Sequence, residues 1–210
     1  MNAHTMLSGE SDRPPAVGQS LSIVVVTTVD GTLLNADTGL CLDARATLEV
    51  LTQHDVPVVL WSDRRGADVI ALQSELGLRH PFVCRGGTHV YVPTLYFPEP
   101  IGLVREEGPW TVIDCSRPSR TISAGTADGA QAIRLLVCLY RVYADDVVIV
   151  GVGSEWQDRD LLHEVDVPIV ISRSDRDQTR LLRRFPDAYV TRACGPAGWC
   201  EAILGPGEEG

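Results

Sequence analysis

The sequence predicts an α/β protein in which helices cover both faces of a doubly wound parallel sheet. Short apolar runs, each long enough for a buried strand, alternate with longer segments whose apolar residues recur at helical spacing. The apolar runs end in polar or glycine-containing turns. Strands that alternate with helices form parallel sheets, because each helix returns the chain to the same end of the sheet.

The predicted elements follow one another along most of the chain. The predicted strands are residues 21–28 (apolar from 21 to 26 and central in the sheet), 56–61, 82–84, 88–92, 147–150, 167–171 and 189–191. The predicted helices are residues 43–53, the segment between Asp63 and residue 76, and residues 130–143, 157–164, 178–185 and 196–204.

Some boundaries have explicit signals. Asp63 is expected to cap the helix that follows it, since an aspartate carboxylate accepts N–H groups of a first helical turn. Gly77 is expected to end that helix, because glycine readily takes the left-handed conformation of a C-cap. Gly86 and Gly87 join the strands on either side of them.

Residues 93–123 interrupt this alternation. They contain five prolines, and their best strand candidate is the segment 111–114. The expected organisation is therefore a core made of residues 21–92 and 124–205, with an insertion at 93–123. Residues 1–20 are polar and proline-containing and predict a disordered leader, and residues 206–210 form a tail.

Composition narrows the class of protein. The net charge of −10 argues against nucleic acid or anionic membranes as partners. No apolar run approaches the ~20 residues of a membrane span, and the leader has no apolar core of a signal peptide. The six cysteines show no metal-site spacing and predict free thiols in a cytoplasmic protein. All 18 basic residues are arginine, so the chain contains no lysine.

The stretch Thr28-Val29-Asp30-Gly31-Thr32-Leu33 follows the first strand and carries the most information about function. A strand that ends in Asp-Gly-Thr resembles the D-x-D-G-T loop of the haloacid-dehalogenase-like phosphatases. In that superfamily the first Asp attacks phosphorus and the second shuttles a proton to the leaving group. The resemblance gives Asp30 the general acid/base position and puts Thr28 at the position of the nucleophile.

Within that superfamily the chain, from about residue 22 to residue 204, resembles the mannosyl-3-phosphoglycerate phosphatases. Residues 61–64 (Trp-Ser-Asp-Arg) resemble a strand ending in Ser and a polar turn. Residues 151–158 (Gly-Val-Gly-Ser-Glu-Trp-Gln-Asp) resemble the family's G-D-S-x-N-D metal loop. Residues 191–203 resemble its closing T-x-A-x-G-P-x-G-W-x-E-A-I, which is the longest and most specific match.

The resemblance also assigns phosphate-binding positions. Ser62 fits the hydroxyl that binds a phosphoryl oxygen, although a strand-end serine that helps to cap the next helix fits the sequence equally well. In the best register Gly129 replaces the lysine that holds nucleophile and phosphate. Arg64, and with it Arg65 and Arg85, offers replacement positive charge at the same edge of the sheet, unless these side chains are simply solvated.

Metal ligands are the third group of positions. The first metal-binding Asp of the family is replaced by Ser154, whereas Asp158 is retained. Mg²⁺ prefers hard carboxylate oxygens, and with Thr28 and Ser154 two of these are missing. Glu155 could compensate or could face solvent. We therefore expect no cofactor, and Mg²⁺ if the protein is catalytically active.

These replacements predict a protein that resembles a phosphatase but is catalytically inactive, and that acts as a binding or regulatory protein. A threonine nucleophile needs a base, and no histidine lies in the neighbouring motifs. The alternative is an active sugar-phosphate phosphatase, or another hydrolase, that uses Thr28 or a rearranged metal site. The insertion 93–123 implies a minimal cap or a large loop.

Expected partners are a protein, a second copy of the chain or a phosphorylated metabolite. Four aromatic residues around the insertion either form a surface that such a protein covers or pack the insertion onto the core. They are Tyr91, Tyr96, Phe97 and Trp110.

Overall fold

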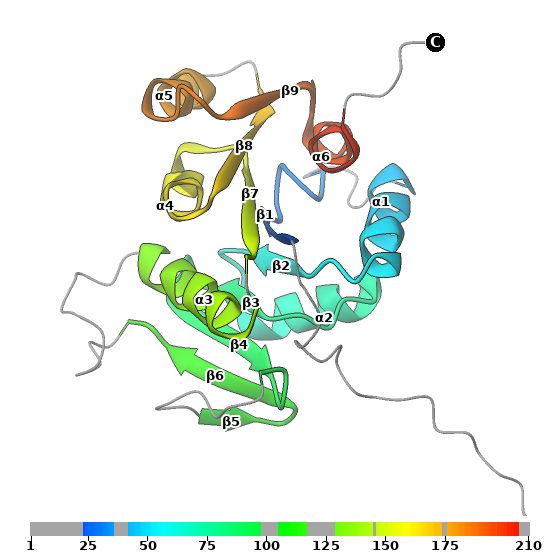
Figure 1. The fold of residues 1–210 in the computed structure, drawn as a ribbon, viewed down its shortest axis with the longest axis vertical. Helices are drawn as coiled ribbons and strands as arrows, with labels where there is room; N and C mark the ends of the chain where they lie inside the picture. Colours follow the sequence, from blue (N-terminus) through cyan, green and yellow to red (C-terminus); the bar gives the residue numbers. More distant parts are fainter. Residues whose placement is uncertain are drawn as a thin grey trace, which may run out of the picture.

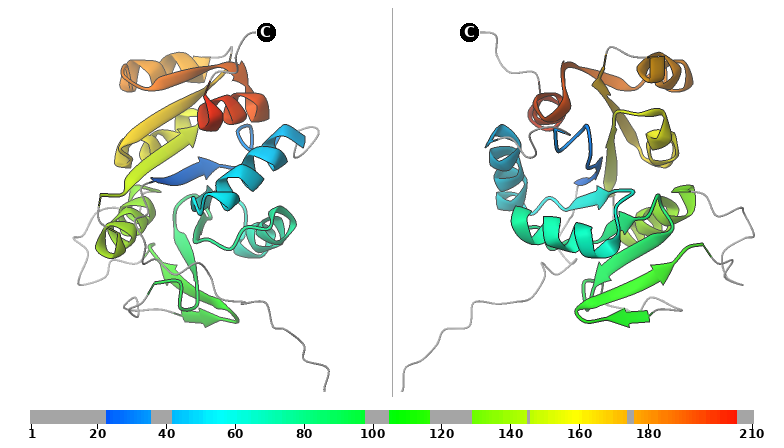
Figure 2. Two further views of the ribbon diagram at one scale, coloured as in Figure 1. Left: turned by 45° about the vertical axis from the view of Figure 1, so that its right-hand side comes forward. Right: turned by 180° about the vertical axis from the view of Figure 1, so that it is seen from behind.

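A computed structural model describes residues 23–35, 42–97, 105–116, 129–144, 146–173 and 176–205. They form a nine-stranded sheet with helices on both faces (Figure 1, Figure 2). The order of the strands is β5-β6-β4-β3-β2-β1-β7-β8-β9. The predicted doubly wound α/β fold is confirmed.

The described elements lie close to the predicted ones. The strands are β1 (Ile23–Thr28), β2 (Val58–Trp61), β3 (Phe82–Cys84), β4 (His89–Pro93), β5 (Arg105–Glu107), β6 (Trp110–Asp114), β7 (Val148–Gly153), β8 (Val167–Ser172) and β9 (Tyr189–Cys194). The helices are α1 (Leu42–Gln53), α2 (Gly66–Leu76), α3 (Gly129–Tyr143), the short 3₁₀ turn η1 (Trp156–Asp158), α4 (Arg159–Glu164), α5 (Arg176–Arg184) and α6 (Gly195–Leu204).

Strand β1 lies in the middle of the sheet and is apolar on both faces. Val24 and Val26 pack into a core that α3 and α4 cover, whereas Val25 packs into a second core under α1, α2 and α6. Figure 1 shows these two groups of helices on opposite sides of the sheet. Side chains of successive strand residues point to opposite faces, so the valines of a strand covered on both faces all pack into a core, and only its end carries the buried polar residues Thr27 and Thr28.

Six neighbouring strands, from β3 to β9 in the sheet order, are parallel to one another. Strand β1 pairs with β2 on one side and with β7 on the other, and Val25 faces Val58 and Val150 in these two pairs. The carboxyl ends of β1, β2 and β7 therefore meet at one edge. Open parallel sheets bind ligands beyond this edge.

The sheet is parallel except at β4, β5 and β6, which run antiparallel to their neighbours. Strands β5 and β6 lie in the insertion 93–123, outside the predicted alternation. Gly86 and Gly87, with φ of 61° and 86°, form a turn too short for a parallel crossover. Strands β5 and β6 then extend the same sheet as a hairpin. The described part of the predicted insertion thus contributes β5 and β6 to the sheet, with the expected strand 111–114 inside β6. Residues 98–104 and 117–123 of the insertion, the leader and the tail lie outside the described residues.

The aromatic residues near the insertion pack into the protein. Tyr91, Tyr96 and Phe97 are at most 7% exposed. The Phe97 ring lies 5.4 Å from that of Tyr140 in α3, and Trp110 packs edge-on against Phe82 at 5.1 Å. Packing of the insertion onto the core, the second of the two expectations for these residues, accounts for Tyr91, Tyr96 and Phe97, whereas Trp110 is half-buried. A partner-binding role stays a prediction.

Helix α2 shows one wrong and one confirmed boundary. It begins at Gly66 with Arg65 at the N-cap and no side-chain cap, so Asp63 does not cap it. Gly77 ends it in the left-handed conformation, with φ of 70°. Gly66 also has a packing role, because a β-carbon there would lie 2.5 Å from the Tyr91 hydroxyl.

Candidate functional site

A pocket of about 240 Å³ lies where β1, β2 and β7 end. The turns after these strands supply most of its lining. The lining residues are Thr28, Val29, Asp30, Trp61, Ser62, Asp63, Gly86, Glu155, Gln157, Asp158, Arg159 and Asp160. Four of the residues singled out in the sequence, namely Thr28, Asp30, Ser62 and Asp158, therefore share one pocket.

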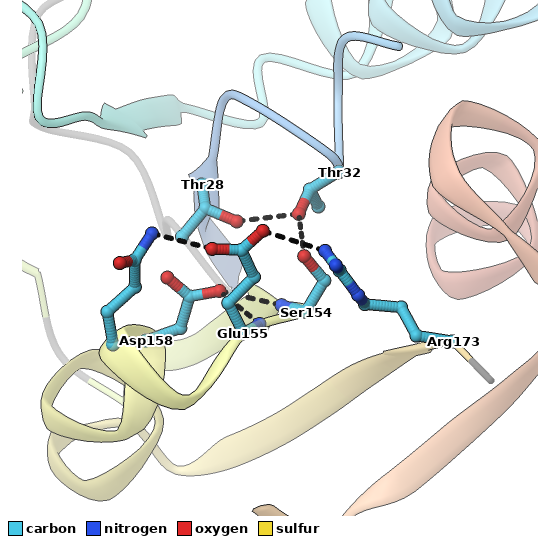
Figure 3. Close-up of polar contacts among 7 residues, drawn as sticks. Thr28, Thr32, Ser154, Glu155, Asp158 and Arg173 are labelled. Atoms are coloured by element: carbon cyan, nitrogen blue, oxygen red, sulfur yellow. Dashed lines mark hydrogen bonds and ion pairs between the residues drawn. The ribbon is translucent and has the colours of Figure 1, made fainter. Parts of the chain in front are cut away.

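Three hydroxyl groups are linked at the nucleophile position (Figure 3). Thr28 Oγ1 lies 2.7 Å from Thr32 Oγ1, and Thr32 donates to Ser154 Oγ at 3.2 Å. A hydroxyl group has one proton, so the bond between the two threonines uses the proton of Thr28. A longer contact of 3.5 Å joins Thr28 Oγ1 to the Val152 carbonyl. This chain of hydrogen-bonded hydroxyl groups links Thr28 and Ser154, the two positions at which the family resemblance expects metal-binding carboxylates.

Asp30 is held by an arginine. Arg64 donates from Nε to Asp30 Oδ2 at 3.1 Å and from Nη2 to Oδ1 at 2.5 Å. Both side chains are partly exposed, at 52% for Asp30 and 37% for Arg64. The two-point geometry is the one in which a guanidinium binds a carboxylate best. Arg64 therefore lies at the predicted edge, with its charge directed to Asp30.

Ser62 is buried at the end of β2, and its hydroxyl accepts the backbone N–H of Arg64 at 3.1 Å. This bond stabilises the turn between β2 and α2. It is not a helix cap, because the helix begins only at Gly66. The hydroxyl also lines the pocket, so the expectation that it contacts a ligand stays a prediction.

Asp158 is 4% exposed and organises the loop after β7. Its Oδ2 accepts the backbone N–H groups of Ser154, at 2.7 Å, and Glu155, at 2.9 Å. Burial raises the pKa of this carboxyl to about 6, and the nearby Glu155 and Asp63 act in the same direction against the two N–H bonds. Gly153 permits the close approach, since a β-carbon there would lie 2.7 Å from Asp158 Cβ.

Glu155 also contributes to the site, and the expectation that it faces solvent is wrong. Arg173 Nη1 donates to its Oε1 at 2.7 Å, and Gln157 donates to its Oε2, also at 2.7 Å. The Glu155 and Arg173 side chains are 33% and 32% exposed. Sequence reasoning missed Arg173, although it directly follows β8, at the edge where parallel strands place ligand-binding residues.

The other predicted positions lie elsewhere or are not described. Arg65 pairs with Asp68 of α2 at 3.1 Å, and its side chain is 77% exposed. Arg85 is an exposed residue of the turn between β3 and β4, with φ of 53°. Gly129 is the first residue of α3. Residues 121–128 before it lie outside the described residues, so the geometry does not test the position of the missing lysine.

The donor set does not fit the metal ion that the resemblance implies. Where carboxylates are expected, Thr28 and Ser154 present hydroxyl groups bonded to Thr32. Asp158 uses one oxygen for two backbone N–H groups, and Glu155 is paired with Arg173. Within the described residues, no group of three or more His, Cys, Asp or Glu side chains could hold a metal ion.

The closing segment 191–203 supports the site from behind. Trp199 is fully buried and donates from Nε1 to Thr27 Oγ1 at 3.0 Å, next to the end of β1. Glu201 accepts the backbone N–H groups of Arg192 and Ala193, each at 3.0 Å. Each of these conspicuous residues therefore has a packing or hydrogen-bonding role in the fold.

Comparison with known proteins shows what the chain is similar to. No family model matches the chain. It is 20% identical to the glucosyl-3-phosphoglycerate/mannosyl-3-phosphoglycerate phosphatase of Methanococcoides burtonii over 263 residues, which cover 86% of this chain and 96% of the relative. This alignment is longer than the 210 residues of the chain, so the relative contains segments that the chain lacks.

Solved structures agree on the fold. A haloacid dehalogenase-like hydrolase from Bacteroides thetaiotaomicron superposes with a TM-score of 0.57 at 14% identity, covering 86% of this chain and 98% of that one. The chain has the fold of the haloacid-dehalogenase-like hydrolases. As the sequence predicted, it is similar in sequence to the mannosyl-3-phosphoglycerate phosphatases.

A second similar structure contains a metal ion. It is the cobalt-bound form of the deoxy-D-mannose-octulosonate 8-phosphate phosphatase of Haemophilus influenzae, with a TM-score of 0.51, 12% identity and coverage of 86% of both chains. The likeness concerns the fold alone.

In the described part of this chain, no helix has the length and hydropathy needed to cross a membrane.

Proposed function

We propose that this haloacid-dehalogenase-like protein has lost phosphoryl transfer and acts as a binding or regulatory protein. The hydroxyl chain from Thr28 through Thr32 to Ser154 carries the proposal. Aspartyl-phosphate chemistry needs a carboxylate that attacks phosphorus. The hydroxyl proton of Thr28 goes instead to Thr32 Oγ1, and its longer contact is with a backbone carbonyl. Neither group is a base that could activate it.

Two further contacts support the loss of catalysis. Asp30, at the general acid/base position, is bonded at both oxygens to Arg64. The donor set of the pocket does not suit Mg²⁺, and the chain has no lysine. Loss of a nucleophile can cost about 10⁶ in rate, and loss of one electrostatic donor about 10²–10³.

The pocket itself supports a binding role. Its volume of about 240 Å³ and its many polar lining groups suit part of a small polar molecule. We propose that the ligand is a phosphorylated metabolite or a protein partner. The carboxylates that this ligand meets in the pocket include Asp30 and Glu155, which are already paired with arginines.

A phosphatase assay on the purified full-length chain tests the proposal. With Mg²⁺ present, we expect no hydrolysis of mannosyl-3-phosphoglycerate or of an aryl phosphate above the buffer blank. Phosphate release that disappears in Thr28→Ala but persists in Thr179→Ala, an exposed threonine of α5, would overturn the proposal. That result would establish the alternative, an active hydrolase that uses Thr28.

A further inference from the structure

We infer that the guanidinium of Arg173 is a fixed cation beside this pocket and takes the place of a metal ion near Ser154 and Glu155. The inference deepens the proposed function and rests on it, because a site with a built-in cation binds its ligand without metal. It assigns a role to a residue outside all the motifs recognised in the sequence.

The position of Arg173 is the first support. A β-carbon built on Gly31 would lie 3.4 Å from Arg173 Nη1, 3.5 Å from Ser154 Oγ and 3.9 Å from Glu155 Oε1. These three atoms therefore surround one side of Gly31, in the loop that follows β1. Figure 3 shows the Arg173 side chain directed at Glu155, Ser154 and Thr32. The guanidinium thus lies beside Gly31 in the same neighbourhood as Ser154, whose hydroxyl replaces one metal-binding carboxylate, and it is bonded to Glu155.

The end of β8 is shaped to direct Arg173 inward. The pairing of β8 with β9 shifts register between Val170 and Ser172. The Ser172 N–H is bonded to Thr191 Oγ1 at 2.9 Å instead of to a strand carbonyl, and Thr191 in turn donates to the Ala193 carbonyl at 2.8 Å. Such irregularities redirect the next side chain. The closing segment of the chain thereby fixes the residue that precedes Arg173.

Charge is the third support. Arg173 Nη1 donates to Glu155 Oε1 at 2.7 Å, and the two side chains are 32% and 33% exposed. The guanidinium therefore neutralises the Glu155 carboxylate with fixed donors. The same guanidinium repels a divalent cation, and at a few ångströms in a partly buried site this repulsion exceeds thermal energy.

Restoring the missing carboxylates tests this role directly. Mn²⁺ binding is measured by calorimetry on the full-length wild type, on Thr28→Asp/Ser154→Asp, and on the same double variant with Arg173→Met. We expect no binding by the wild type. Removing Arg173 should tighten binding by the double variant more than about tenfold.

A matched control removes one arginine far from the pocket. Arg105→Met in the double variant breaks the exposed ion pair with Glu107 in β5 at the other end of the sheet, and should change affinity less than about twofold. Equal affinity of the double variant with and without Arg173, or pocket-dependent Mn²⁺ binding by the wild type, would contradict the inference.

A second measurement does not depend on the folding of the double variant. Mg²⁺ should raise the melting temperature of the single variant Arg173→Met, because Glu155 then lacks its cation, and should leave the wild type unchanged. An equal response of the two proteins refutes the role of Arg173. Phosphate release is recorded separately, so catalysis by the wild type would overturn the proposed function without deciding the metal question.

Discussion

Two buried titratable residues act on stability in opposite directions. Asp158 has a pKa raised to about 6, mainly by burial, and His80, which contacts Tyr96 Oη, has a pKa lowered to about 4 by burial. Between pH 4 and 6 the folded state binds more protons than the unfolded chain at Asp158 and fewer at His80. Stability therefore falls with rising pH through Asp158 and rises through His80. The stability of the wild type as a function of pH therefore shows only the difference between the contributions of Asp158 and His80.

Asp158→Asn separates the two contributions. The amide oxygen of asparagine can still accept the N–H groups of Ser154 and Glu155, but it carries no charge. As the pH rises from 4 to 6, the free energy of unfolding of the variant should increase by on the order of 2 kcal/mol relative to that of the wild type. This difference between the two proteins should stay constant above pH 7. Urea unfolding at a series of pH values measures it.

Asp160→Asn is the control for this prediction. It removes a carboxylate from the same pocket, but from a side chain that is 31% exposed. Its pH-dependent difference should be smaller, because water screens exposed charges. Equal differences for Asp158→Asn and Asp160→Asn would show that burial of Asp158 has no special effect.

At the scale of elements, the contact between β9 and α6 holds the site edge together. Gly198 of α6 lies so close to β9 that a β-carbon would be 2.3 Å from the Ala193 carbonyl oxygen and 2.9 Å from Thr191 Oγ1. Thr191 bonds Ser172 at the end of β8, and Trp199 bonds Thr27 at the end of β1. One helix thereby fixes the ends of two site strands.

Gly198→Ala should destabilise the protein by about 1–3 kcal/mol, because the backbone it would strike cannot rotate away. Within a helix, replacing glycine by alanine normally stabilises a protein by about 0.5–1 kcal/mol. A loss of stability in Gly198→Ala would therefore point to the close contact with β9. Gly108→Ala, where no atom lies within 4 Å but φ is 61°, should cost about 1 kcal/mol of conformational strain. Chemical denaturation of both variants measures the difference, and a stabilising Gly198→Ala would show that α6 can move away.

The elements that the sequence predicted well are those governed by local pattern. β-branched apolar runs located the parallel strands, and the edge rule for such strands brought Thr28, Ser62 and Asp158 to one pocket. Three features depend on tertiary contacts and escaped prediction. The Asp63 cap is absent because the turn uses the Ser62 hydroxyl, β4 pairs antiparallel after a two-glycine turn, and Arg173 is directed by the irregular end of β8.

At the scale of the whole molecule, aromatic packing joins the antiparallel half of the sheet to the helices. Phe97 stacks on Tyr143 at 5.3 Å and lies edge-on to Tyr140 at 5.4 Å, both in α3. Tyr96 Oη lies 3.1 Å from Tyr140 Oη. These contacts fix the chain just before residues 98–104, which lie outside the described residues.

Phe97→Asp should destabilise the protein by about 3–5 kcal/mol, since it removes a buried ring and buries a carboxylate. Leu95→Asp is the matched control two residues away. Leu95 is 87% exposed with φ of 65°, a conformation that aspartate tolerates better, so its replacement should change stability by less than about 0.5 kcal/mol. Unfolding curves and light scattering on both variants distinguish this packing role of Phe97 from a role in binding a second copy of the chain. In the second case, Phe97→Asp would keep its stability and lose self-association.

The central place of β1 has a consequence for the order of folding. Val25 pairs with Val58, 33 residues later, but also with Val150, 125 residues later. Loop closure costs more entropy as the separation grows, so the first pair can form early and the second only late. During synthesis, β1 must wait with one edge uncovered until β7 has left the ribosome. The hydroxyl chain from Thr28 to Ser154 spans the same gap, so the pocket is among the last parts of the molecule to assemble, and chaperones that cover strand edges would act before it exists.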